Sequence, residues 1–86
     1  MTMTASRTSE RITETEFEAF YLRTARTLHG YLCRLCRDAA TADEVLQEAY
    51  IRMINVPAMD DLPRKAYLYK TATNILRDRW RKQRRA

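Results

Sequence analysis

The chain has 86 residues, enough for one small domain and too few for a barrel enzyme or a doubly wound nucleotide fold. Hydrophobic residues make up 45% and charged residues 31%, and with only one Gly and two Pro there is little turn chemistry for hairpins, so we expect an all-α fold. The formal net charge is +5, and no apolar stretch suits a membrane span or a secretory signal, so a cytoplasmic location is expected.

The amino-terminal segment, residues 1–13, lacks apolar periodicity and is predicted to be a flexible tail before a helical domain at 14–81. A first helix is predicted from about Thr15 to Arg37, because apolar side chains recur there at steps of three and four. Thr15 and Glu18 have the spacing of a capping box. The predicted buried stripe comprises Phe17, Tyr21, Thr24, Leu28, Leu32 and Leu35.

A second helix is predicted to start at a further capping box, Thr41 with Glu44, and to end at about Asn55. Only residues 38–40 separate it from the first helix, so the two helices should be antiparallel neighbours. The predicted apolar side comprises Ala42, Val45, Leu46, Ala49, Tyr50, Met53 and Ile54.

A third helix is predicted from about Pro63 to Arg81 or beyond, because Pro suits a first helical turn and the preceding loop, 56–62, contains a Pro and two Asp. Residues 82–86 have no large apolar side chain that a core could hold and are predicted to begin a basic linker. The apolar positions of the third helix are Leu68, Ala72, Ile75 and Leu76, with Tyr67, Tyr69 and Trp80 beside them.

Charge is unevenly distributed along the chain. Residues 64–86 carry nine basic side chains against one acidic side chain, and the preceding residues have a net charge of −3. A basic end indicates a polyanionic partner, most often nucleic acid, with a membrane surface or an acidic protein as alternatives. Aromatic side chains among these cations suit unpaired bases better than a duplex, although each aromatic side chain is as consistent with a place in the core. For base readout the available groups are Asn74 and the loop before the third helix.

Enzyme chemistry has little support, because the chain has one His and one Gly and its Ser residues lie in the tail. No cofactor is predicted. His29, Cys33 and Cys36 fall on one side of the first helix and could meet one ion, but structural zinc takes four ligands and the chain has no further Cys or His. Three interpretations of these residues stay open. The favoured one is that the two thiols are small apolar side chains at the edge of the buried stripe. The others are a zinc site, similar to that of certain anti-sigma factors, and a redox dithiol.

Two segments together resemble the second domain of bacterial sigma factors of the extracytoplasmic-function type: FEAFYLRTARTLHGYLCRLCRDAATADEVLQEAYIRMI and RKAYLYKTATNILRDRWRKQRR. The resemblance covers about Phe17 to Arg85. It depends on the order of its parts: an aromatic-rich first helix comes first, ADEVLQEAY follows, and YLYK precedes Asn74 and a basic end. There are two departures. Tyr67 stands where the family often has Trp, and the family's helical domain for the minus-35 element does not follow within these residues, so weak promoter binding is expected.

The resemblance implies a function in promoter recognition and melting, with RNA polymerase core, promoter DNA and an anti-sigma factor as partners. The second helix would dock on the coiled-coil clamp helices of the largest polymerase subunit through Asp43, Glu44, Gln47, Glu48 and Arg52. The third helix and its preceding loop would hold the melted minus-ten non-template strand, with a base turned out near residues 56–64 and Asn74. The implied DNA-binding residues are Arg64, Tyr67, Tyr69, Lys70, Asn74, Arg77, Arg81 and Arg84.

Two other functions remain open at the level of the sequence. One is a zinc-binding, anti-sigma-like regulatory helical module, and the other is a basic helical domain that binds DNA without sequence preference.

Overall fold

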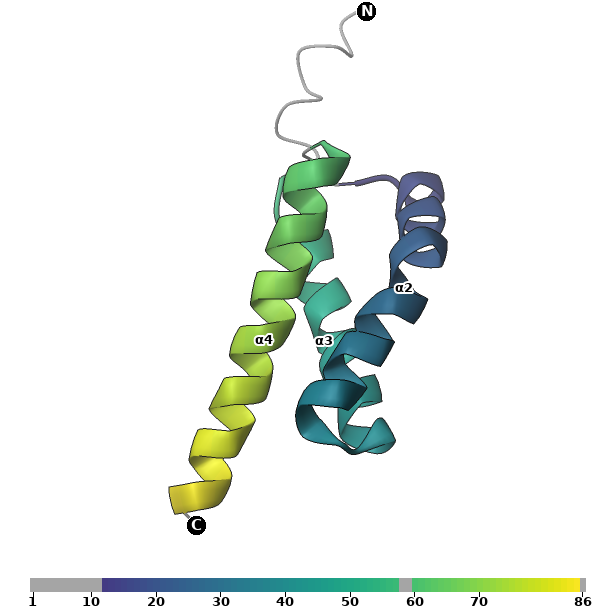
Figure 1. The fold of residues 1–86 in the computed structure, drawn as a ribbon. Coiled ribbons are helices and arrows are strands. Elements are labelled where there is room, and N and C mark those ends of the chain that lie inside the picture. The colour runs from purple at the N-terminus through teal and green to yellow at the C-terminus, as the bar shows by residue number, and fades with distance from the viewer. Residues whose placement is uncertain (1–11, 58–59, 86) are drawn as a thin grey trace, which may run out of the picture.

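The computed structural model describes residues 12–57 and 60–85, with the side chains of residues 61, 84 and 85 outside the description. Within these ranges it forms three α-helices and no strand: α2 (Glu14–Cys36), α3 (Ala39–Ile54) and α4 (Asp61–Arg85) (Figure 1). The predicted all-α fold is therefore confirmed. Residues 1–11 of the predicted tail lie outside the described residues.

The helix α3 packs against both of its neighbours more extensively than α2 and α4 pack against each other, and α4 extends past the ends of the other two (Figure 1). Apolar side chains from all three helices meet in one core. Burying each large side chain contributes about 1.5–3 kcal/mol to folding. The buried apolar side chains are Phe20, Leu28, Leu32, Ala42, Val45, Leu46, Ala49, Tyr50, Met53, Leu68, Ala72, Ile75 and Leu76.

The apolar positions predicted for the second and third helices are confirmed, apart from Ile54, which is only partly buried. The stripe predicted for the first helix is wrong at two places. Phe20, which it left out, is 1% exposed, and Leu35 is 40% exposed. The buried residues of α2 follow one another at steps of four, Phe20, Thr24, Leu28 and Leu32, whereas Phe17 and Tyr21 beside them are only partly buried. Leu35 lies in the last turn of α2, beside the connection to α3.

A capping box begins α2 two residues before the predicted one. The Thr13 N–H donates to Glu16 Oε1 and the Glu16 N–H donates to Thr13 Oγ1, both at 3.1 Å. The repeated Thr-Glu pattern allows either register. The upstream register places Ile12 and Phe17 at the two positions of a hydrophobic staple, and both side chains pack against the core. Apolar contact thus selects between two equivalent polar caps.

The connection between α2 and α3 is shorter than predicted, and the capping box expected at Thr41 and Glu44 is wrong. Arg37 ends α2 in the left-handed conformation, with φ 57°. Asp38 is then the extended N-cap residue of α3, and its carboxylate accepts a hydrogen bond of 2.5 Å from the Thr41 hydroxyl. This hydrogen bond is the main reason why the pKa of Asp38 is lowered.

A buried hydrogen bond joins α2 to α3. The Thr24 hydroxyl donates to the carbonyl oxygen of Phe20 at 2.8 Å, so the Tyr50 hydroxyl, 2.5 Å from Thr24 Oγ1, is the donor in their contact. Burial raises the pKa of Tyr50 above its ordinary value of 10.0, opposed by the hydrogen bond with Thr24. The phenol is thereby held neutral within the core.

This raised pKa predicts a loss of stability in alkali. The unfolded chain ionises Tyr50 near pH 10.0 but the folded chain does not, so the free energy of unfolding should be fully retained below pH 10 and fall as pH rises toward the folded pKa. Urea unfolding of the wild type and of Tyr50→Phe between pH 8 and 11 measures this. The Phe variant should show the shallower decline, whereas parallel declines would assign the effect to other groups.

Candidate functional site

The acidic side chains of α3 form one exposed surface, opposite to the buried side of that helix. Asp43, Glu44 and Gln47 are exposed, and Glu48 is half-buried. Ile51, near the carboxyl end of this surface, is 58% exposed. We call this surface the α3 face and define it as Asp43, Glu44, Gln47, Glu48, Ile51 and Arg52. The structure thus brings together all five side chains predicted to bind the polymerase.

Two ion pairs involve the α3 face. Arg52 Nη2 lies 2.8 Å from Glu48 Oε2 one turn earlier, and Arg79 Nη1 of α4 lies 2.9 Å from Glu44 Oε1. Such exposed pairs are each worth about 0–1 kcal/mol and can be exchanged for an external partner at little cost. Among the described residues Asp43 makes no ion pair. The carboxylates of this face are therefore accessible.

Four polar side chains of α4, three of them basic, lie on the side of that helix opposite its buried residues. Lys70, Asn74, Arg77 and Arg81 are all exposed and follow one another at steps of four, three and four, which keeps them in line along the helix. We call these four residues the basic row. Arg81 pairs with Asp78 on the same helix, and no acid of the α3 face pairs with a member of the basic row among the described residues. The side chain of Arg84 lies outside the described residues.

The aromatic side chains predicted to bind bases lie on different sides of α4. Tyr69 turns toward α2, where its ring centroid is 5.3 Å from that of Tyr31, whose hydroxyl is 3.5 Å from Thr73 Oγ1. Tyr67, two positions away and hence on the other side of the helix, is partly buried against the core. Burial raises the pKa of Tyr69, opposed by the nearby Arg34 guanidinium. Sequence reasoning missed Tyr31, although it lies three residues after the core residue Leu28.

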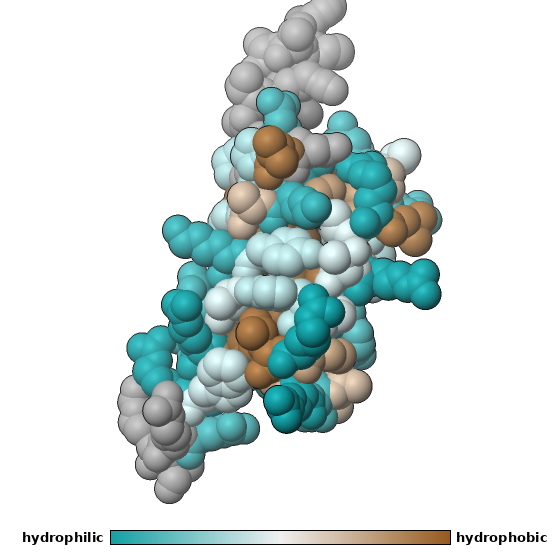
Figure 2. Space-filling model, viewed as in Figure 1, coloured by the Kyte–Doolittle hydropathy of each residue, from teal (hydrophilic) through white to brown (hydrophobic). Residues whose placement is uncertain are grey.

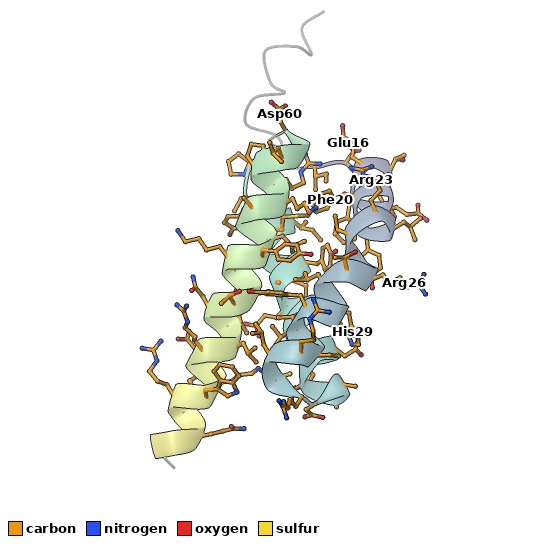
Figure 3. All side chains as sticks on the ribbon, in the orientation of Figure 1. Glu16, Phe20, Arg23, Arg26, His29 and Asp60 are labelled. Carbon is orange, nitrogen blue, oxygen red and sulfur yellow. The ribbon has the colours of Figure 1, made fainter. Side chains whose placement is uncertain are left out.

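Arg64 lies away from the basic row. It is 8% exposed, and its guanidinium lies 5.4 Å from the centroid of the Phe20 ring, which also has Arg23 at 5.8 Å. Figure 3 shows Phe20 between α2 and α4, while Arg26 projects outward from α2. A cation over an aromatic face is attracted by the ring quadrupole, and this contact helps to hold Arg64 inside the domain. The geometry gives Arg64 a packing role inside the domain.

The side chains of the possible metal site point to different partners. Cys33 Sγ lies 3.7 Å from His29 Nδ1, but the Cys36 thiol donates to the Asp38 carbonyl oxygen at 3.4 Å. Both thiols are free and pack at the edge of the core. Within residues 12–57 and 60–85, no three His, Cys, Asp or Glu side chains are grouped so that they could hold a metal ion. These contacts favour the interpretation as small packing side chains.

Figure 2 shows hydrophilic side chains along the outer edge of α4 and a strip of intermediate hydropathy between α4 and α2. In the described part of the chain, no helix has the length and apolar character needed to cross a bilayer. Two oppositely charged surfaces on one small helical domain are the arrangement that a link between a protein and a nucleic acid requires.

Residues 16–86 match the family model for sigma-70 region 2, which covers the whole region of the predicted resemblance. A search of curated proteins and a search of solved structures found no match. The chain therefore belongs to the sigma-70 region 2 family, and is a sigma-factor domain of the kind involved in core polymerase binding and promoter melting at the start of transcription.

Proposed function

We propose that this domain is the promoter-melting domain of an extracytoplasmic-function sigma factor, with the α3 face bound to the clamp helices of the largest polymerase subunit and the basic row bound to the melted minus-ten non-template strand. The observation that carries the proposal is the separation of charge. The acids of the α3 face and the cations of the basic row are exposed and do not pair with each other among the described residues. Both surfaces are therefore available at once.

The composition of the α3 face supports a protein partner. The α3 face combines one exposed apolar side chain, Ile51, with charged and amide side chains, and protein interfaces likewise join apolar and polar groups. Its carboxylates favour a partner with a basic surface, because complementary charge speeds association and fixes orientation. An anti-sigma factor that covered this face would compete with the polymerase.

The basic row supports a single-stranded nucleic acid partner. Three cations in line along the helix contact successive phosphates, and Asn74 among them offers an amide to a base edge. Tyr69 and Tyr31 are half-buried where α4 meets α2, and their open parts present aromatic surface for stacking. The base pocket predicted near residues 56–64 remains a prediction, since residues 58 and 59 lie outside the described residues.

Loss of cations from the basic row tests the DNA-binding part of the proposal. Arg77→Gln and Arg81→Gln should each weaken binding to a labelled minus-ten single strand and reduce the slope of log affinity against log salt by about 0.7 per lost phosphate contact. Fluorescence anisotropy over a salt series measures both quantities. Arg26→Gln is the matched control, because this exposed arginine on α2 projects away from α4 (Figure 3).

Two results would count against the proposal. One is an equal loss of slope in the Arg26 control, which would mean that overall charge and not the basic row attracts the strand. The other is equal affinity for a minus-ten strand and a scrambled strand in the presence of core polymerase, which would indicate DNA binding without sequence preference.

A further inference from the structure

Tyr31 of α2 and Tyr69 of α4 form an aromatic pair between two helices, which we call the tyrosine pair. The ring centroids are 5.3 Å apart with an interplanar angle of 52°, and the Tyr31 hydroxyl lies 3.5 Å from Thr73 Oγ1, one turn along α4 from Tyr69. Both side chains are only half-buried, and Figure 2 shows a strip of intermediate hydropathy open to the surface between these helices. The open part of the pair offers a flat surface on which a base can stack.

The tyrosine pair is adjacent to the basic row on the surface of α4. One line of residues at steps of four connects them: Tyr69, Thr73, Arg77 and Arg81. Each such step turns by about 40° around a helix, so the line runs from the side of α4 that faces α2 to two members of the basic row. A strand that lies on the basic row can therefore continue onto the tyrosine pair.

On the other side of the pair, α2 offers a cation that the function proposed above does not use. Arg34 is exposed and lies three residues after Tyr31, so the two side chains share one side of α2. Its positive charge is close enough to Tyr69 to oppose the rise in the pKa of that phenol. Within the described part of the chain, Arg34 makes no ion pair. The guanidinium is available to an external anion.

No acidic residue cancels the positive charge around the tyrosine pair along these helices. Residues 27–37 and residues 62–77 contain no Asp or Glu. Lys70 and Arg77 belong to the second of these segments, and Arg34 belongs to the first. Aromatic surface with cations on either side suits an unpaired nucleotide, which brings both a flat base and a phosphate.

Gly30 leaves room for a ligand beside Tyr31. It is the one glycine of the chain and lies in the interior of α2, where glycine destabilises a helix relative to alanine. A Cβ at this position would meet no atom within 4 Å, so packing inside the domain gives no reason for glycine there. Close approach of a ligand to the backbone is a reason, because Arg34 lies one turn further along the same helix.

We propose that the tyrosine pair and Arg34 form a nucleotide-binding position, with one unpaired base of the melted strand stacked on the pair and its phosphate bound by Arg34. The inference rests on the proposed function and adds α2 to the surface that holds the strand. An acidic side chain of a protein partner is the competing occupant. The tyrosine rings and their continuity with the basic row favour the strand, since a carboxylate would need only the cation.

Replacing Arg34 tests the phosphate contact. For a labelled minus-ten single strand, Arg34→Gln should reduce the slope of log affinity against log salt by about 0.7, the effect of one lost phosphate contact. Fluorescence anisotropy over a salt series with the full chain measures this slope. Arg26→Gln is the matched control and should leave the slope unchanged, because Arg26 is also an exposed arginine of α2 but projects outward from that helix (Figure 3).

Replacing Tyr31 tests the stacking. Tyr31→Leu keeps an apolar side chain against the core but removes the ring, and should weaken binding of the minus-ten strand at least about fivefold. Tyr31→Phe, which keeps a ring, should recover most of that loss. A strand of the same length with abasic units in place of the bases has the same charge, so it should bind the wild type and Tyr31→Leu almost equally. Circular dichroism and thermal unfolding verify that the variants are folded.

Three results would each overturn the inference: an unchanged slope in Arg34→Gln, unchanged affinity in Tyr31→Leu, or an equal loss of slope in Arg26→Gln. After either of the first two, a loss of affinity in Arg77→Gln would leave the proposed function intact. If Arg34→Gln weakened the binding of core polymerase and not of the strand, the surface would belong to a protein partner. No binding of the strand to the wild type would overturn the proposed function and this inference with it.

Discussion

Replacing Asp43 and Glu48 together by lysine is expected to weaken the binding of this domain to RNA polymerase core by at least about tenfold, or about 1.4 kcal/mol. Both carboxylates belong to the α3 face, where they meet the basic surface of the proposed partner. The double variant puts like charges into contact, and that juxtaposition costs more than loss of the attraction alone. A pull-down or a binding titration with core polymerase measures the effect.

The loss should arise at the interface and not from unfolding. Asp43 is exposed and Glu48 is half-buried, and among the described residues the double variant breaks one ion pair, the exposed pair of Glu48 with Arg52, worth at most about 1 kcal/mol. A double variant with Glu14→Lys and Glu18→Lys changes the net charge equally on α2, and both of these glutamates are exposed. Equal binding by the wild type and the α3 double variant would reject the assignment of this face.

The largest effect on stability is expected for Leu28→Ala. Leu28 is fully buried on α2, and its truncation removes transfer free energy and leaves a cavity, for about 3–5 kcal/mol. Small domains are stable by only about 5–15 kcal/mol, so this variant should lose a large part of its free energy of unfolding. Urea unfolding followed by circular dichroism measures the change.

Leu22→Ala is the matched control for this prediction. Leu22 lies on the same helix but is 73% exposed, so the same chemical change should alter the free energy of unfolding by no more than about 0.5 kcal/mol. If Leu22→Ala were as costly as Leu28→Ala, the packing of α2 described above would be wrong.

The helices and the core of α3 and α4 follow from sequence because one periodic apolar side identifies each helix. The same rule failed for Phe20, because Phe17 and Tyr21 offer an equally periodic start to the apolar side of α2, and only packing shows that the buried row begins at Phe20. The start of α2 could not be predicted from polar pattern alone, because Thr13 and Thr15 both have a glutamate three residues later. The contact of Ile12 with the core decides between them, and tertiary packing is needed to see it.

The candidate surfaces show a similar limit. The polar members of the α3 face and the basic row could be predicted, because in each set they are neighbours on one helix. Contacts between helices could not be predicted, and they account for the burial of Arg64 over Phe20 and for the ion pair between Glu44 and Arg79. Pairing of Tyr31 with Tyr69 likewise depends on how α2 crosses α4.

The most direct test of the separation of functions is to measure two affinities on the same variants: one for core polymerase and one for a minus-ten single strand. Our account predicts that Asp43→Lys with Glu48→Lys loses polymerase binding without weakening strand binding, and that Arg77→Gln with Arg81→Gln does the opposite. If either double variant, folded by circular dichroism, lost both activities together, a single shared surface would have to serve both partners and the account would be contradicted.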